Sequence, residues 1–327
     1  MPKIPKILVI VGPTASGKTA LAIALAKKYN GEIVSADSRQ IYRGMDIGTA
    51  KAPISSERNE VTKSSVPEKA GIHAYLHSVP HHLVNIKNPN DDYSVADYKH
   101  DAIRAINDIV EREKLPILVG GTGLYIKAVI DNLTIPEVKA DPRLRKRLEA
   151  QIQKEGLISV FKKLVSLDPD AAYLVDSKNP RRVIRALEIA TGTNKPFSAS
   201  RKLGPPLFDA ARIGIYPGKE ILEKRIKKRT KEMLKNGLIK EVKTLVKKYG
   251  PECKAFDGIG YREVIDYLNG KISLKEVEGL INKNSIHYAK RQMTWFKKDK
   301  RIRWIKNRTA NVSLELQWVT PNRPLRT

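Results

Sequence analysis

The chain begins its ordered pattern with Lys6-Ile-Leu-Val-Ile-Val11 and continues Gly12-Pro-Thr-Ala-Ser-Gly-Lys-Thr19, and this stretch decides the fold. A continuous apolar, β-branched run is typical of a strand that is covered on both faces of a parallel sheet. The next eight residues match the phosphate-loop pattern G-x-x-x-x-G-K-[ST] in full. Residues 18–29 then place Leu and Ala side chains on one helical face. A strand, a glycine-rich turn and a helix in this order predict a P-loop α/β core.

The alternation of strands and helices continues beyond this unit. Residues 32–37 and 116–119 predict further strands, and residues 95–109 predict an amphipathic helix that Ser94 caps. From residue 141 to about residue 202 the pattern is helical only, and β character resumes at residues 212–216. Long basic helices are expected at about 219–235, 238–249, 261–268 and 274–297, and a short strand at 302–305.

We therefore expect an α/β fold with four parts. A P-loop NTPase-like parallel sheet core is formed by residues 1–139 and 209–308, the second part carrying the basic C-terminal helices. An all-helical insertion domain spans residues 140–208, and residues 309–327 form a flexible tail.

Charge is spread unevenly along the 327 residues. The chain has 61 Lys and Arg against 35 Asp and Glu, a formal net charge of +26. Residues 1–136 hold 17 basic and 14 acidic residues, whereas residues 137–327 hold 44 and 21. A basic field of this kind suits a polyanion such as nucleic acid, although basic composition also occurs in proteins that only need solubility.

Composition excludes several classes of protein. The single cysteine, Cys253, cannot form an intramolecular disulfide or a cysteine-rich zinc site. No run approaches the roughly 20 apolar residues that cross a bilayer, and the mean hydropathy is −0.39. The N-terminal apolar stretch is too short for a secretory signal. We expect a cytoplasmic protein without membrane contact.

The phosphate loop predicts an anion site whose ligand the pattern leaves open. Backbone N–H groups wrap a phosphate, Lys18 reaches the outer phosphate, and Thr19 can ligate Mg²⁺. Most such loops hold ATP or GTP, which favours a kinase or NTPase. That interpretation is incomplete, because the strand at 116–119 runs into Gly120-Gly-Thr122 without a carboxylate.

A second candidate site follows the strand at residues 32–37. Asp37 stands at its carboxyl end, where α/β sheets place their ligands, and Arg39 and Gln40 can hydrogen-bond a base edge or a phosphate. The alternative is that Asp37 caps a turn and Arg39 is a solvated charge.

Seven segments together resemble the tRNA dimethylallyltransferase (tRNA isopentenyltransferase) family in order and spacing from about residue 6 to residue 306. They are Gly12–Thr19, Asp37-Ser-Arg-Gln-Ile-Tyr42, Asp46-Ile-Gly-Thr-Ala-Lys51, Pro80-His-His-Leu83, Gly120-Gly-Thr-Gly-Leu-Tyr125, Arg181-Arg-Val-Ile-Arg-Ala-Leu-Glu188 and Ala289-Lys-Arg-Gln-Met-Thr-Trp295. The resemblance implies transfer of a dimethylallyl group from dimethylallyl diphosphate to N6 of adenosine 37, next to the anticodon, in tRNAs that read codons starting with U.

The resemblance implies roles for the residues of both sites. Asp37 is the expected general base, and Thr14, Lys18 and Arg229 are the other expected catalytic residues. The diphosphate would be held by Gly12, Pro13, Thr14, Ala15, Ser16, Gly17, Lys18 and Thr19 with Arg225 and Arg229, and Mg²⁺ by Thr19. Arg225 and Arg229 are spaced i, i+4 on one helix face. An ordinary solvated basic helix is the alternative for them.

The expected partner is the anticodon stem-loop of tRNA, bound by a monomer. The residues expected to contact it are Asp37, Ser38, Arg39, Gln40, Thr122, Arg145, Arg181, Arg182, Val183, Ile184, Arg185, Ile259, Gly260, Tyr261, Arg262, Lys290, Arg291, Gln292 and Trp295. Arg181 departs from the family pattern, which has Gln there. For Trp295 a buried core aromatic is at least an equal alternative.

Other interpretations are weighed against this one. The segment between Lys51 and Pro80 is longer than in the family pattern, and we interpret residues 52–79 as an exposed loop. His73, His77, His81 and His82 invite a metal site, but no acidic or cysteine partner has matching spacing. The alternative functions are an adenine-nucleotide prenyltransferase, a P-loop kinase for a small metabolite, and a non-catalytic RNA-binding protein.

Overall fold

Among the described residues, seven strands hydrogen-bond in the order β3-β4-β2-β5-β1-β6-β7, and all neighbours except β3 and β4 are parallel. The computed structural model describes residues 4–51, 72–76, 78–136, 138, 141–200 and 202–306, with only the backbone of residues 72–76 and 200. The strands are β1 (Lys6–Val11), β2 (Gly31–Ala36), β3 (Ile72–Leu76), β4 (Val79–His82), β5 (Leu115–Gly120), β6 (Asp209–Ile215) and β7 (Arg303–Ile305).

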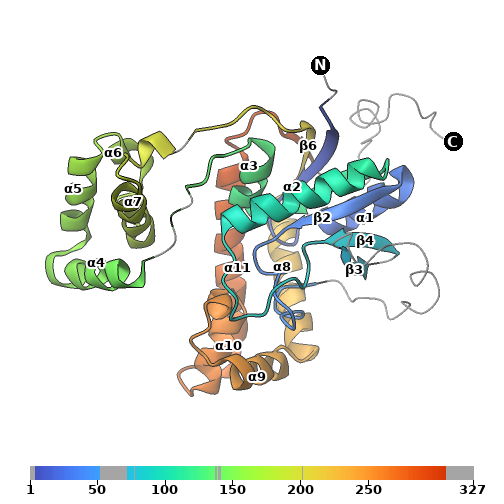
Figure 1. The fold of residues 1–327 in the computed structure, drawn as a ribbon. Helices are drawn as coiled ribbons and strands as arrows, with labels where there is room; N and C mark the ends of the chain where they lie inside the picture. The colour runs from blue at the N-terminus through green and yellow to red at the C-terminus, as the bar shows by residue number, and fades with distance from the viewer. Residues whose placement is uncertain are drawn as a thin grey trace. The chain divides into compact units, whose positions relative to one another are not determined.

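Contacts divide the chain into two units, residues 1–130 with 207–327 and residues 131–206. The first unit contains the sheet (Figure 1). Its helices are α1 (Lys18–Tyr29), α2 (Val95–Glu111), α3 (Gly123–Ile130), α8 (Lys219–Lys235), α9 (Leu238–Tyr249), α10 (Tyr261–Leu268) and α11 (Leu274–Phe296), with the short 3-10 turn η3 (Lys254–Asp257).

Helices cover both faces of the sheet because the side chains of β1 alternate between two buried clusters. Ile7 and Val9 pack into a cluster with residues of α2 and α3, whereas Leu8 and Ile10 pack into a cluster with α1. A strand buried on both faces explains why residues 6–11 are apolar without interruption.

The register of the parallel strands brings three loops to one edge of the sheet. Val11 of β1 and Ala36 of β2 both pair with Gly120 of β5, so these strands end at the same level. The phosphate loop, Asp37 and Gly121 follow directly. This is the edge at which open α/β sheets bind ligands.

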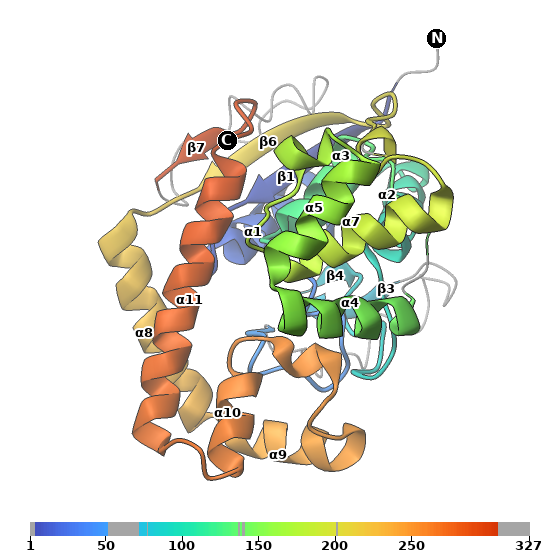
Figure 2. The ribbon, with the colours of Figure 1, turned by 90° about the vertical axis from the view of Figure 1, so that its left-hand side faces the viewer.

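The C-terminal helices form a second core of the same unit. α8 and α11 pack side by side, and α9 and α10 lie at one end of the pair (Figure 2). Leu238, Val242, Val264, Val277 and Ile281 are buried in one cluster that also includes Ile41 and Met45 from the segment after β2. The helices therefore cover the loop that carries Asp37.

The second unit, residues 131–206, is helical. It contains α4 (Pro142–Glu155), α5 (Leu157–Leu167), α6 (Ala171–Leu174), α7 (Pro180–Thr193) and the 3-10 turn η2 (Ser198–Ser200). Its core includes Leu148, Val160, Leu164 and Leu187. The unit begins nine residues before, and ends two residues before, the 140–208 expected for the insertion.

The fold class predicted from the sequence is confirmed, and the strands β3 and β4 are additional. His81 and His82, treated above as candidate ligands, belong to β4. Most of the expected loop at 52–79 and all of the expected tail at 309–327 lie outside the described residues, as do His77 and the side chain of His73. In the part of the chain that the structure describes, no helix has the length and hydropathy needed to span a bilayer.

Candidate active site

The phosphate loop leaves β1 and wraps toward the first turn of α1. Ala15 and Gly17 have left-handed backbone conformations, with φ of 60° and 97°, and the Ser16 N–H donates to Pro13 O at 3.2 Å. Gly17 immediately precedes α1, so its conformation starts the helix without a side-chain cap. The loop amides and the helix N-terminus together favour an anion here.

Three cationic side chains surround the loop. The Lys18 ammonium donates to Pro13 O at 3.3 Å, and burial lowers the pKa of Lys18 to about 8 although Asp37 acts to raise it. Arg229 Nη1 donates to Thr14 Oγ1 at 2.9 Å, and Arg225 Nη1 donates to Ser16 O at 3.1 Å. The i, i+4 spacing on α8 thus places both arginines against the phosphate loop.

Two buried polar atoms of this site have no hydrogen-bond partner among the described residues, Ser16 Oγ and Arg229 Nε. Buried polar atoms are ordinarily paired, so an unpaired hydroxyl and an unpaired guanidinium N–H beside a phosphate loop indicate room for a ligand. Both can donate a hydrogen bond to an anion.

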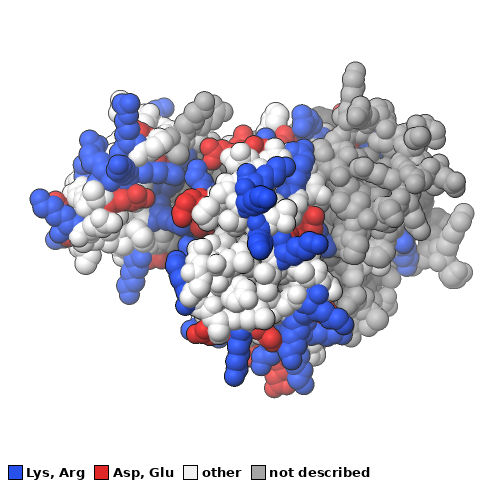
Figure 3. All heavy atoms as spheres, turned by 90° about the horizontal axis from the view of Figure 1, so that it is seen from below, with Lys and Arg blue, Asp and Glu red and all other residues white. Residues whose placement is uncertain are grey.

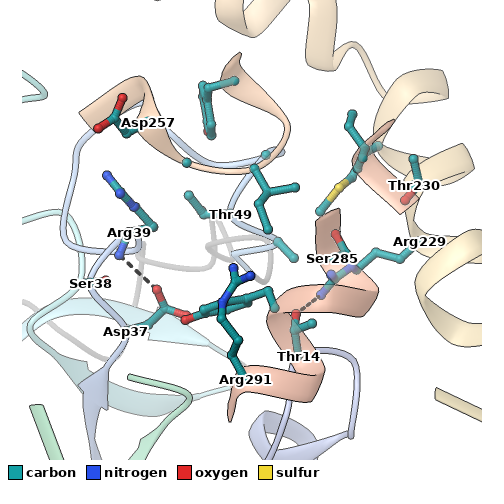
Figure 4. Close-up of a pocket in the computed structure, with 18 residues that line it drawn as sticks. Thr14, Asp37, Ser38, Arg39, Thr49, Arg229, Thr230, Asp257, Ser285 and Arg291 are labelled. Carbon is teal, nitrogen blue, oxygen red and sulfur yellow. Dashed lines mark hydrogen bonds between the residues drawn. The ribbon is translucent and has the colours of Figure 1, made fainter. Parts of the chain in front are cut away.

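Asp37 stands at the end of β2, close to the phosphate loop. Its Oδ1 accepts the Arg39 N–H at 2.9 Å, while Arg39 Nη1 donates to Ala255 O at 3.0 Å in η3. Figure 4 shows the Asp37 carboxylate in the cavity together with Thr14, Arg229 and Arg291. The general-base candidate and the phosphate loop are therefore parts of one site.

The cavity itself has a volume of about 300 Å³ and is lined by residues from the phosphate loop, the segments after β2 and η3, and helices α8 and α11. Its lining combines polar side chains, among them Asp37, Ser38, Arg39, Asp257, Arg229, Thr230 and Ser285, with the apolar Met233 and Ile281. A ligand with one polar and one hydrocarbon part matches this lining.

Gln292 of α11 connects two of the loops. Its Oε1 accepts the Thr14 N–H at 2.8 Å, and its Nε2 donates to Gly121 O at 2.9 Å. A Cβ at Gly121 would overlap the Gln292 amide, so glycine is required for this close approach. The expectation that Gln292 contacts tRNA is wrong, because the side chain is buried and both amide groups bond to backbone.

The wall formed by residues 46–51 is held from α9. The Glu241 carboxylate accepts the N–H groups of Asp46, Ile47 and Gly48 at 3.1, 2.7 and 3.1 Å and the Tyr261 hydroxyl at 2.6 Å. Tyr261 is 1% exposed and packs against Gly48, where no Cβ fits. Tyr261 therefore supports the wall and also lines the cavity, and its expected contact with tRNA stays a prediction.

The remaining residues expected near Asp37 divide between bracing the site and facing the cavity. Gln40 Nε2 donates to Thr49 O at 3.3 Å, and Thr122 Oγ1 accepts the Ser38 N–H at 3.2 Å. Ile259 lines the cavity at the segment after η3, where Gly260 is buried. Arg262 is exposed, and its guanidinium lies 3.6 Å from Asp257.

Candidates at the end of α11 face different directions. Arg291 lines the cavity of Asp37, whereas Lys290 lines a separate cavity between α8 and α11. Trp295 is 38% exposed and packs against Gly123, so its side chain is partly buried.

Within the helical unit, α7 carries the expected tRNA contacts. Arg181 and Arg182 are exposed at its start. Val183 and Ile184 are 0% and 5% exposed in the core of the unit, so their expected contact with tRNA is wrong. Their neighbour Arg185 is partly exposed.

Two arginines of this unit share one buried carboxylate. Glu188 accepts Arg145 Nε at 2.6 Å and Arg145 Nη2 at 2.8 Å, and Arg185 Nη1 at 3.2 Å. Burial acts to raise the pKa of Glu188, but the hydrogen bonds from the two arginines lower it overall. The pairs fix α4 on α7 and leave about a third of each arginine side chain exposed.

His81 and His82, the two candidate metal ligands whose side chains the structure describes, are buried in β4. His82 Nε2 lies 2.7 Å from Glu32 Oε2, inside a buried cluster with Arg112 and Lys114. No group of three or more His, Cys, Asp or Glu among the described residues is arranged to hold a metal ion. Thr19, the expected Mg²⁺ ligand, is exposed in the first turn of α1.

Tyr288 is a cavity residue that the sequence interpretation missed. It hydrogen-bonds Thr122, and burial together with the nearby Asp37 raises its pKa to about 12, so the phenol stays protonated. The Arg291 guanidinium carbon lies 5.7 Å from the centre of its ring. Ile281, Ser285, Tyr288 and Gln292 recur at helical spacing, and this periodicity was the signal that could have placed Tyr288 beside the site.

The surface around these elements is strongly basic. Figure 3 shows Lys and Arg outnumbering Asp and Glu on one face of the described residues. On the outer sides of α8 and α9 the following side chains are exposed: Lys224, Lys227, Lys228, Lys231, Lys240, Lys243, Lys247 and Lys248.

A parallel sheet with a phosphate loop, cationic side chains and a carboxylate at one cavity defines the class of P-loop group-transfer enzymes. Comparison with known proteins gives the family within that class. The family model of IPP transferase matches residues 40–299, and that of isopentenyl transferase matches residues 5–66.

Relatives match over nearly the whole chain. The tRNA dimethylallyltransferase of Pelotomaculum thermopropionicum is 43% identical over 306 residues, covering 92% of this chain and 90% of the relative. That of Acetivibrio thermocellus is 44% identical over 304 residues, covering 91% of each. The chain belongs to the IPP transferase family, among the tRNA dimethylallyltransferases.

Solved structures agree with this assignment. The tRNA isopentenylpyrophosphate transferase of Bacillus halodurans is 40% identical, with a TM-score of 0.64 over 92% of this chain and 89% of that one. A eukaryotic dimethylallyltransferase acting on tRNA is 27% identical, with a TM-score of 0.71 over 99% of this chain and 81% of that one.

Proposed function

We propose that the protein transfers the dimethylallyl group of dimethylallyl diphosphate to N6 of adenosine 37, next to the anticodon, in tRNAs that read codons starting with U. The observation that carries this proposal is that Asp37, Thr14 and Arg229 line one and the same cavity. Membership of the family and the names of the relatives support the same reaction.

The phosphate loop would hold the diphosphate of the donor. Breaking the allylic C–O bond leaves negative charge on diphosphate, and the loop amides, Lys18, Arg225 and Arg229 are fixed where they can stabilise it. The unpaired Ser16 Oγ and Arg229 Nε add two donors. These groups stabilise the leaving anion more than the intact donor, which lowers the barrier.

Magnesium fits this arrangement through Thr19. Mg²⁺ in phosphate-transfer sites keeps several waters and takes few protein ligands besides the phosphate oxygens. The Thr19 hydroxyl, exposed at the start of α1, is a donor of that kind, and no cluster of carboxylates is required. When bound, the ion would neutralise part of the charge on the diphosphate.

Asp37 would act on the acceptor. As the N6–C1 bond forms and the C1–O bond breaks, N6 becomes acidic, and its proton passes to the Asp37 carboxylate. The bond from the Arg39 N–H to Oδ1 holds the carboxylate in the cavity. The products are the N6-prenylated adenosine and diphosphate.

The tRNA would bind through its phosphates and through the extruded base. Exposed Arg181 and Arg182 on α7 and the lysines of α8 and α9 suit phosphate contacts. Arg291 over the Tyr288 ring offers a planar surface beside Asp37 for the target adenine. We include in the proposal that the protein is cytoplasmic and acts as a monomer, which sedimentation equilibrium would test.

The test uses labelled dimethylallyl diphosphate with unmodified tRNA or with AMP, comparing the native protein with Asp37→Asn. We expect label in tRNA only, and a loss of turnover of about 10²-fold or more in the variant while diphosphate binding is nearly unchanged. Label in AMP alone identifies an adenine-nucleotide prenyltransferase. ATP turnover without label transfer identifies a kinase, and either result overturns the proposal.

A further inference from the structure

Two buried apolar side chains form part of the wall of the cavity that contains Asp37. Met233 of α8 and Ile281 of α11 line it, and their exposed fractions are 8% and 2%. Both belong to the buried cluster that includes Leu238, Val242 and Val277. Because this cluster is packed directly behind the two side chains, the cavity cannot continue past them without repacking.

Met233 and Ile281 each lie one helical turn from another residue that lines the cavity. Met233 lies one turn after Arg229 on α8, and Arg229 bonds to Thr14. Ile281 lies one turn before Ser285 on α11, which also lines the cavity. Figure 4 shows Arg229, Thr230 and Ser285 together on the side away from Asp37, Arg39 and Asp257.

We propose that Met233 and Ile281 form the end of the subsite for the donor's hydrocarbon chain and restrict that chain to five carbons. This inference rests on the proposed function. With the diphosphate held by the phosphate loop, the head of the donor is fixed, and the chain must occupy the apolar part of the lining. A longer chain then overlaps Met233 or Ile281, because a packed wall does not yield without cost.

The expected size of the donor preference follows from the selectivity of hydrophobic pockets for ligands of different length. One methylene too many or too few changes selectivity by roughly 10–200-fold. A ten-carbon donor carries a whole additional isoprene unit, so we expect the native protein to prefer the five-carbon donor by at least about 10²-fold in kcat/KM.

The experiment compares dimethylallyl diphosphate with the ten-carbon allylic diphosphate as donors to tRNA. Met233→Ala is expected to reduce the preference for the five-carbon donor at least about tenfold while keeping transfer of the five-carbon group. Ile281→Val removes one methyl group from the same wall and is expected to shift the preference in the same direction by less. It also tests the proposal if Met233→Ala does not fold.

Met293→Ala is the matched control. Met293 is likewise 8% exposed, but it lines the separate cavity between α8 and α11. Truncation of the Met293 side chain should disturb the packing to a comparable extent. Because Met293 does not line the cavity of Asp37, the donor preference is expected to stay at the native value.

Four results are decisive. An unchanged donor preference in Met233→Ala or Ile281→Val, with five-carbon transfer retained, overturns the inference, and so does a native protein that uses both donors equally. An equal shift in Met293→Ala overturns it too, since the effect is then one of general loosening. Absence of transfer to tRNA from either donor by the native protein would overturn the proposed function itself.

Discussion

Arg229 and Arg225 lie one turn apart on α8 and reach the same loop, but we expect them to differ in their contribution to the reaction. Arg229 is largely buried, bonds to the Thr14 hydroxyl and has an unpaired Nε, and burial lowers its pKa while Asp37 acts to raise it. Arg225 is exposed and bonds to a backbone carbonyl. Charged hydrogen bonds in a desolvated site are stronger than those in water.

The substitutions Arg229→Gln and Arg225→Gln measure this difference. One charged hydrogen bond to a leaving anion contributes about 1.5–3 kcal/mol, and Arg229 has two donors in place, so we expect a loss of about 10²–10³-fold in the rate of transfer. An exposed charge contributes about 0.2–1 kcal/mol, which corresponds to less than about sixfold for Arg225.

The assay is a single-turnover transfer to an anticodon stem-loop, with the dissociation constant of diphosphate measured in parallel. Thermal melting checks that both variants fold. Equal losses in the two variants would refute the reasoning, because burial would then not decide the effect. A loss confined to diphosphate affinity in Arg229→Gln would also contradict it, since it would show uniform binding without stabilisation of the transition state.

Three further predictions concern stability, the Gln292 brace and RNA binding. Burial acts to raise the pKa of Glu32, but hydrogen bonds from Arg112, His82 and Lys114 hold it well below its usual range, so the carboxylate stabilises the fold above the ordinary pKa of about 4.3. Glu32→Gln should therefore lower the free energy of unfolding by urea by about 3 kcal/mol at neutral pH. This difference between variant and native protein should shrink as the pH falls below about 4. Asp108→Asn, at the partly exposed end of the cluster, should lower the free energy of unfolding by less than about 1 kcal/mol. Gln292→Ala leaves two backbone groups unpaired and should raise KM for the donor. Gly121→Ala should be tolerated better in the Gln292→Ala background than in the native chain, because the clash with the Gln292 amide is then absent. Additive effects in the double-mutant cycle would contradict the bracing role of Gln292. The affinity for tRNA should fall with salt at a log–log slope of about −0.7 to −0.9 per phosphate contact, and a flat profile measured by filter binding would remove the role given to the basic helices.

The parts of the site that could be predicted from the sequence are those whose residues are close together in the chain. The phosphate loop is one continuous pattern, and a strand before it and a helix after it fix its orientation. Arg225 and Arg229 needed only the helical period to be placed on one face, although their contact with the loop came from the structure. Asp37 needed only the rule that ligands gather where parallel strands end.

The residues that sequence reasoning missed act across long separations. Glu241 stabilises the cavity wall by binding three N–H groups of residues 46–48, and no local pattern on α9 marks it. Met233 is an ordinary apolar residue of an amphipathic helix, and only the topology brings it to the cavity of Asp37. Non-local pairings of this kind are fixed by the sheet order and by the packing of α8 on α11, which periodicity alone does not determine.

The wrong assignments have a different cause, because the sequence already held the evidence against two of them. Val183 and Ile184 recur with Leu187 at helical spacing, which is typical of a buried face, although the resemblance implies a tRNA contact for the whole segment 181–185. Periodicity should have outweighed proximity, since a helix exposes neighbours in sequence to opposite environments. The same rule separates Lys290, Arg291 and Gln292, which are adjacent in sequence but face a second cavity, the Asp37 cavity and the backbone of the phosphate loop. When one residue of a helix is inferred to lie at a site, the residues three and four positions away on that helix are therefore expected at the same site. By this rule Gln292 predicts Tyr288, and Ser285 predicts Ile281, as residues of the site.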